Sequence, residues 1–146
     1  MVTRAGDPGA SGRELEHTAD LGLEFEAPTL AALFERAALA MLGLMLDLSG
    51  VEPRARVVVR VDAEGLEELL RDWLQAILTG CLTDGLAAAE VAVTAVDARH
   101  VEGTLAGEPV DPARHRVYTE LKGVTHHRLA VREVPGGWWA RVIFDV

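Results

Sequence analysis

Hydrophobic and polar residues alternate over residues 20–26, and this pattern predicts a β-strand with one buried face. Asp20 falls on the polar face of this strand, opposite the core. The period then changes to that of an amphipathic helix. This helix begins after Thr29, its N-cap, and ends at Ser49-Gly50. Its apolar stripe consists of Leu30, Leu33, Phe34, Ala37, Met41, Leu44, Met45 and Leu48.

A second strand and a second helix follow. Residues 55–62 alternate in hydrophobicity, which predicts a strand. A helix begins near Gly65, and acidic side chains in its first turn complement the positive end of the helix dipole. Asp72 lies on the polar edge of this helix. The apolar stripe consists of Leu66, Leu69, Leu70, Trp73, Leu74, Ile77, Leu78 and Cys81.

The second half of the chain is rich in candidate strands, separated by Gly, Pro and Asp. A Pro-Gly-Gly sequence at residues 135–137 predicts a hairpin between the last two strands. Because strand and helix alternate once and several strands follow, the sequence predicts an α+β fold: a mainly antiparallel sheet with two amphipathic helices packed on one face. The candidate strands are 91–97, 99–106, 117–125, 129–134 and 138–145.

Length and composition fit one domain. The 146 residues are 49% hydrophobic, which is enough to bury a core. We expect a flexible, Gly-rich tail over residues 1–13 and a single domain over residues 14–146. The sequence has no run of about 18 apolar residues, and residues 1–12 lack the apolar core of a signal peptide. We therefore expect a cytoplasmic protein that does not bind a membrane.

Charge and cysteine content exclude several classes of function. The formal net charge of −9 argues against a surface that grips nucleic-acid phosphates strongly and directly. It suits a basic protein partner or a metal ion, although such acidity also simply keeps many proteins soluble. The single cysteine, Cys81, excludes an internal disulfide and a cysteine zinc site.

The end of the sequence carries carboxylate groups that could bind a metal ion through their oxygen atoms. The carboxylate of Asp145 lies beside the α-carboxylate of Val146, and Asp20 stands at the start of the first predicted strand. Hard cations such as Ca²⁺ bind several oxygen ligands. If the two strands are neighbours, Asp20, Asp145 and Val146 supply part of a metal site. The alternative is a solvated chain end.

Three further residues are candidates for the same cluster. His17 is either a ligand, a proton donor or a hydrogen-bonded structural histidine. Lys122 lies beside Glu120 on the polar side of its predicted strand, either in a solvated ion pair or as a cation near the carboxylates. Asp72 is the third candidate, and its alternative role is to stabilise the N-terminus of its helix. The sequence contains no phosphate-binding glycine motif and no serine in a nucleophile elbow.

Five blocks of sequence, in order over residues 14–146, resemble the archease family. The match is specific because the blocks occur together and end in Asp-Val. The sequence departs from the family at His126, where an aromatic residue is usual. The blocks are residues 17–22 (HTADLG), 37–41 (AALAM), 69–74 (LLRDWL), 121–127 (LKGVTHH) and 136–146 (GGWWARVIFDV).

The resemblance implies a protein cofactor rather than an enzyme. Archeases activate RtcB, a GTP-dependent RNA ligase, by promoting guanylylation of the ligase histidine and multiple turnover in tRNA splicing or RNA repair. The family binds a divalent ion, usually Ca²⁺, with Mg²⁺ or Mn²⁺ as alternatives. Transferred to this sequence, the resemblance assigns the metal to Asp20, Asp145 and Val146, and a family lysine to Lys122. RNA and GTP are then contacted through the ligase.

Two other classes of function stay open. One is a chaperone-like or general protein-interaction module with an acidic docking face, which predicts effects on unrelated clients. The other is a metal-dependent enzyme, although we find no nucleophile or base beyond the carboxylates. GTP consumption by the isolated protein distinguishes an enzyme from a cofactor.

Overall fold

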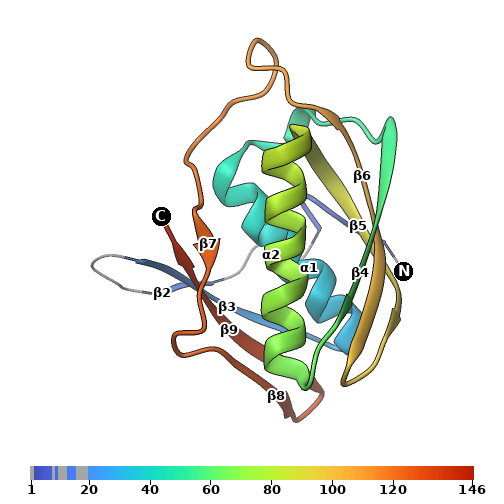
Figure 1. Cartoon of the computed structure of the whole chain (residues 1–146), viewed down its shortest axis with the longest axis vertical. Helices are drawn as coiled ribbons and strands as arrows, with labels where there is room; N and C mark the ends of the chain where they lie inside the picture. Colours follow the sequence, from blue (N-terminus) through green and yellow to red (C-terminus); the bar gives the residue numbers. More distant parts are fainter. Residues whose placement is uncertain (1, 8, 10–12, 16–19) are drawn as a thin grey trace.

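The strands of the computed structural model form two antiparallel sheets (Figure 1). The model describes residues 2–7, 9, 13–15 and 20–146. The first sheet has the order β1-β5-β6-β4, and the second has the order β2-β3-β9-β7 with β8 also paired to β9. The first sheet comprises β1 (Thr3–Arg4), β4 (Ala55–Asp62), β5 (Leu86–Val96) and β6 (His100–Pro109). The second comprises β2 (Arg13–Leu15), β3 (Asp20–Ala27), β7 (Gly123–Val124), β8 (Ala130–Val134) and β9 (Gly137–Asp145).

Two helices, α1 (Leu30–Met45) and α2 (Leu66–Asp84), pack against both sheets (Figure 1). The α+β prediction is confirmed, but the strands divide into two sheets instead of one. The reason lies in α1, where every residue from Ala32 to Leu42 except Arg36 is buried. A helix that is apolar around most of its circumference must be covered on more than one side. Strands β5 and β1 cover it from one sheet, and β3 and β9 from the other.

The predicted N-cap of α1 is confirmed, but its predicted end is wrong. The hydroxyl of Thr29 accepts a hydrogen bond of 3.1 Å from the N–H of Ala32. The helix stops at Met45, and Leu46 is already extended. The short 3₁₀ turn η1 (Leu48–Gly50) follows. The helical spacing of apolar residues continues to Leu48, so the prediction treated the helix and this separate turn as one element.

The segment 117–125 was predicted as one strand, and this is wrong for most of its length. Val117 forms only an isolated bridge with Leu46, and only residues 123–124 form a strand, β7. The partner strand β9 has little room, since β3 pairs along one of its edges and β8 occupies residues 137–141 of the other edge. The two-residue strand β7 uses the space that remains, opposite Phe144 and Asp145.

Part of the segment predicted as a flexible tail belongs to the fold. Residues 3–4 pair with β5 as strand β1, and Thr3 is buried. The hydroxyl of Thr3 donates a 2.7 Å hydrogen bond to Glu35 Oε1, while Glu35 Oε2 accepts a 2.9 Å bond from the N–H of Val93. The buried carboxylate of Glu35 is satisfied in this way, which explains why an acidic residue is tolerated inside α1.

None of the helices among the described residues is both long enough and apolar enough to span a membrane.

Candidate functional site

Strands β3 and β9 place Asp20 directly opposite Asp145. Their register runs without a shift from this pair to Ala27 opposite Trp138. The register is determined by burial, because Leu23 and Phe25 on β3 lie opposite Val142 and Ala140 on β9 in the core. If either strand slipped by one residue, its two side chains of this set would turn toward the other face.

The two carboxylates are therefore neighbours at one end of the second sheet. Residues directly opposite in an antiparallel pair point to the same face, with Cβ atoms roughly 4.5–5.5 Å apart. Asp145 is exposed and Asp20 is half-buried. Val146 follows Asp145 along the chain and is 43% exposed. We call Asp20, Asp145 and Val146 the acidic tip.

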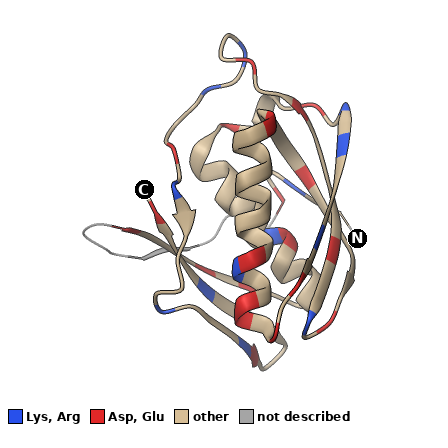
Figure 2. Ribbon diagram, in the orientation of Figure 1, with Lys and Arg blue, Asp and Glu red and all other residues tan. Residues whose placement is uncertain are grey.

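Strand β7 brings Lys122 to the acidic tip. Gly123 lies opposite Asp145 on the edge of β9 not used by β3. The N–H of Lys122 donates a 2.8 Å hydrogen bond to the carbonyl oxygen of Asp145. Figure 2 shows the result as red at the end of β9 beside blue in the segment that enters β7. The exposed Lys122 side chain makes no ion pair with any described residue, including Glu120.

Side chains of α2 hold β7 in place. Gln75 Oε1 accepts a 3.0 Å hydrogen bond from the N–H of Val124, and Arg71 Nε donates a 2.9 Å bond to the Val124 carbonyl oxygen. Arg71 also contacts Asp72, with 3.0 Å between the nitrogen and oxygen atoms. Asp72 is thus connected to the acidic tip through Arg71 and β7. This arrangement favours a role in positioning β7 over a role as a metal ligand.

The sequence interpretation did not assign a role to Arg71 or Gln75. Their spacing of four residues puts both on one face of α2, which is the signal that indicates a shared contact. The other predicted residue, His17, lies outside the described residues.

The donor chemistry of the acidic tip fits part of the coordination shell of a hard divalent ion. Two side-chain carboxylates and one α-carboxylate supply oxygen atoms, the ligands that Ca²⁺ and Mg²⁺ prefer. Ca²⁺ takes about six to eight such ligands. Within the described residues, no three His, Cys, Asp or Glu side chains are grouped closely enough to hold a metal. Water or a partner molecule would have to complete the shell.

Comparison with known families and curated proteins gives consistent matches over most of the chain. The model of the Archease protein family matches residues 13–146. The chain is 37% identical over 136 residues to the protein archease of Methanopyrus kandleri, covering 91% of this chain and 97% of that protein. It is 30% identical over 135 residues to the protein archease of Pyrococcus furiosus, covering 90% of this chain and 95% of that protein.

Solved structures share the fold. The solution structure of Methanobacterium thermoautotrophicum protein 1598 superposes with a TM-score of 0.80 at 32% identity, covering 94% of this chain and 99% of that one. The crystal structure of an archease from Thermotoga maritima, described as a possible chaperone, gives a TM-score of 0.64 at 19% identity. It covers 92% of this chain and 96% of that one, and at this identity it bears on the fold alone.

Proposed function

The chain belongs to the archease family, and from this premise we propose that it is a protein cofactor that activates a GTP-dependent RNA ligase of the RtcB type. In this proposal it promotes guanylylation of the ligase histidine and multiple turnover, in tRNA splicing or RNA repair. The observation that carries the proposal is the register that puts Asp20 opposite Asp145, beside the α-carboxylate of Val146.

The acidic tip is the part of the molecule that acts on the ligase. Three anionic groups this close repel one another unless a cation offsets their charge. Asp20, Asp145 and Val146 would hold a divalent ion, Ca²⁺ or alternatively Mg²⁺ or Mn²⁺, whose charge offsets that of GTP phosphates in the ligase pocket. The ion would be shared with the ligase, since the tip supplies only part of a shell.

Lys122 and the α2 side chains have supporting roles. The exposed ammonium group of Lys122 is available to a phosphate oxygen or to the tip carboxylates. Arg71 and Gln75 hold the main chain of Val124, which fixes the position of Lys122 two residues earlier. The position of Lys122 beside the tip is thus set by helix α2 and does not depend on the ligase.

Multiple-turnover RNA ligation by the cognate ligase, with GTP and divalent metal, tests the proposal. A substoichiometric amount of this protein is expected to raise the number of turnovers. Asp145→Asn keeps the size of the side chain but removes its charge, and it should reduce the stimulation by at least about ten-fold. Glu133→Gln, at an exposed site on β8, is the matched control and should stimulate like wild type. Unchanged turnover and guanylylation with wild-type protein would refute the function.

A second candidate is a chaperone-like interaction module with an acidic docking face. An apolar groove with exposed rim residues in this structure favours it. This candidate predicts that the protein suppresses aggregation of unrelated clients and that Asp145→Asn is fully active in such an assay. Client aggregation followed by light scattering distinguishes the two candidates.

A further inference from the structure

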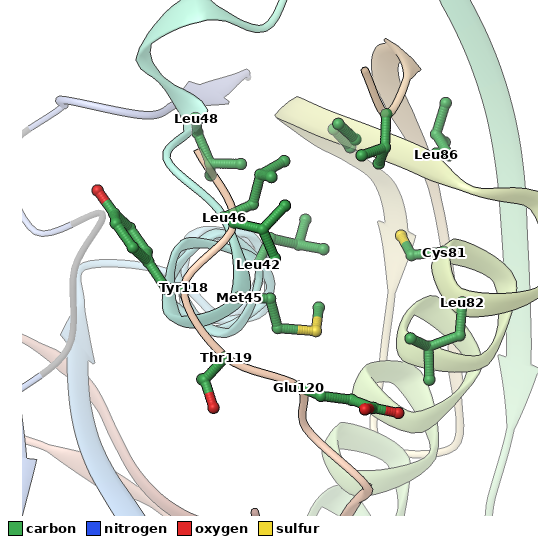
Figure 3. Close-up of a pocket in the computed structure, with 14 residues that line it drawn as sticks. Leu42, Met45, Leu46, Leu48, Cys81, Leu82, Leu86, Tyr118, Thr119 and Glu120 are labelled. Carbon is green, nitrogen blue, oxygen red and sulfur yellow. The ribbon is translucent and has the colours of Figure 1, made fainter. Parts of the chain in front are cut away.

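An apolar groove of about 410 Å³ opens between the C-terminal ends of α1 and α2. We call residues 116–120, which cross its mouth, the strap. Figure 3 shows Leu42, Met45 and Leu46 on one side of the groove, with Cys81 and Leu82 of α2 on the other. The groove is large enough for several apolar side chains.

Exposed apolar side chains are concentrated on this groove. Among the described residues, eight large apolar side chains are exposed, and four of them line it. Leu82, Val117 and Tyr118 are 53%, 59% and 52% exposed. Single exposed apolar residues are ordinary, but a contiguous group beside a groove indicates a binding surface.

The strap is held in position although its side chains are exposed. Its main chain is tied to the end of α1, because Asp47 N–H donates to the Arg116 carbonyl oxygen at 2.8 Å and Tyr118 N–H donates to the Met45 carbonyl oxygen at 2.9 Å. His115, the residue just before the strap, has a buried side chain that contacts Glu108 and anchors this end of the strap. A groove with a fixed wall requires little ordering when a partner binds.

His115 itself is fixed by two hydrogen bonds. Its Nδ1 accepts from the N–H of Asp111 at 2.8 Å, so its Nε2–H donates to Glu108 Oε1, also at 2.8 Å. At the other end of the strap, the side chain of Leu121 is fully buried. The strap is therefore anchored at both ends.

The charge of the groove indicates the chemistry of its partner. Glu120 is the only charged residue among the described residues that line the groove, and Figure 3 shows it extending from the strap toward α2. Neither Glu120 nor Thr119 makes a hydrogen bond or ion pair within the described part of the chain. A basic side chain next to an apolar one would complement this surface.

The groove lies near the acidic tip along the chain. Glu120 precedes Lys122 by two residues, and the N–H of Lys122 is bonded to Asp145. Two residues span at most about 7 Å. A protein that binds Lys122 and the tip is therefore within reach of Glu120 at the edge of the groove.

On the basis of the proposed function, we propose that this groove is a second docking site for the RtcB-type ligase. It takes an apolar side chain of the ligase flanked by a Lys or Arg that pairs with Glu120. The groove supplies affinity, whereas the acidic tip supplies activation.

Leu82→Glu tests the proposal, because it introduces a charge at an exposed position of the groove. Its dissociation constant for the cognate ligase, measured by isothermal titration calorimetry, is expected to rise about ten-fold or more. Stimulation of ligation at saturating protein should equal that of wild type. Val58→Glu, at an equally exposed (54%) position on β4, is the matched control and should bind like wild type. Glu120→Lys should also weaken binding, and Glu133→Lys should not.

The outcomes separate this proposal from the proposed function. If wild type stimulates the ligase and Leu82→Glu binds as tightly as Val58→Glu, the groove proposal is wrong and the proposed function stands. If wild type neither binds nor stimulates the ligase, both are wrong. A second copy of this chain is an alternative occupant of the groove, and light scattering at increasing protein concentration tests for it. If the protein forms a dimer and Leu82→Glu disrupts that dimer, the groove binds a second copy and the proposal is wrong. Circular dichroism of each variant establishes that it is folded.

Discussion

At the scale of single residues, the acidic tip carries an electrostatic cost. Like charges directly opposite in an antiparallel pair destabilise the sheet. Asp20 and Asp145 nevertheless stand in this relation, and Lys122 contributes only a main-chain bond to the described contacts. A pair of this kind is expected where an ion or a partner supplies the missing positive charge.

The stability of the tip should therefore respond to metal. With chelator present, Asp145→Asn should melt at a slightly higher temperature than wild type, because the variant lacks the like-charge pair. Added CaCl₂ should raise the melting temperature of wild type and of Glu133→Gln, but not that of Asp145→Asn. At 100 times its dissociation constant, the ion would stabilise wild type by about 2.7 kcal/mol. Calorimetry measures these shifts, and equal responses to calcium in all three proteins would contradict the site.

The thiol of Cys81 gives a second prediction at this scale. Burial raises the pKa of Cys81 from 9.0 to about 11, and the nearby Asp84 adds to the shift. At pH 8 the thiolate population is then about a hundred-fold lower than that of an unperturbed thiol. Alkylation by iodoacetamide, followed by mass spectrometry, should be slow in native protein and fast in urea. A native rate equal to that of free cysteine would contradict burial at the groove.

At the scale of elements, the short strand β7 depends on helix α2. A two-residue strand has little stability of its own, and Val124 uses Gln75 and Arg71 to satisfy both of its main-chain groups. Helix α2 thus fixes the strand that carries Lys122 to the acidic tip.

Removal of Gln75 should loosen β7 without unfolding the molecule. In Gln75→Ala, the N–H of Val124 loses its acceptor, and its hydrogen exchange measured by NMR should quicken by roughly ten-fold. Thr79→Ala is the control, because Thr79 only accepts a bond from the other end of the Gln75 amide. Unchanged exchange at Val124 in Gln75→Ala would mean that α2 does not hold β7.

Local signals explain which elements could be predicted from the sequence. The cap at Thr29, the stripe of α2 and the turn at residues 135–136 depend on neighbours along the chain, and all three were predicted. Gly136 has a φ of 84°, which a residue with a side chain rarely adopts, so the hairpin signal was strong.

Features that depend on distant partners could not be predicted in the same way. The segment 117–125 alternates like a strand, but whether it pairs is decided by the free edge of β9. In sequence, residues 3–4 resemble a flexible tail. Their place in the fold depends on distant partners, because they pair with β5 and Thr3 bonds to Glu35. The carboxylates of the tip could be predicted from the sequence. The contacts of Arg71 and Gln75 with Val124 could be recognised only from the folded structure.

At the scale of the whole molecule, one core joins the two sheets. The largest buried side chains include Trp73 of α2, Phe34 of α1 and Phe144 of β9. Trp73 also donates a 3.1 Å hydrogen bond from its ring to the carbonyl oxygen of Phe34. Since both sheets pack on the same helices, neither sheet has a separate core of its own.

This shared core predicts a single cooperative unfolding transition. Tryptophan fluorescence reports on Trp73 in the core and on Trp138 and Trp139 in the second sheet, whereas far-ultraviolet circular dichroism reports on all elements. The two urea curves should coincide. Two separated midpoints would show that the sheets unfold independently.

The pairing of β3 with β9 has a consequence for biosynthesis. Strands β4 to β6 and helix α2 follow one another along the chain, so they can assemble while translation continues. Strand β3 emerges early from the ribosome and must wait for β9, its long-range partner, before its edge is covered. Asp20 therefore meets Asp145 only once β9 has been made. A transcript cut short before β9 yields a product with an unpaired β3 edge and no acidic tip, and such a product is a target for proteolysis.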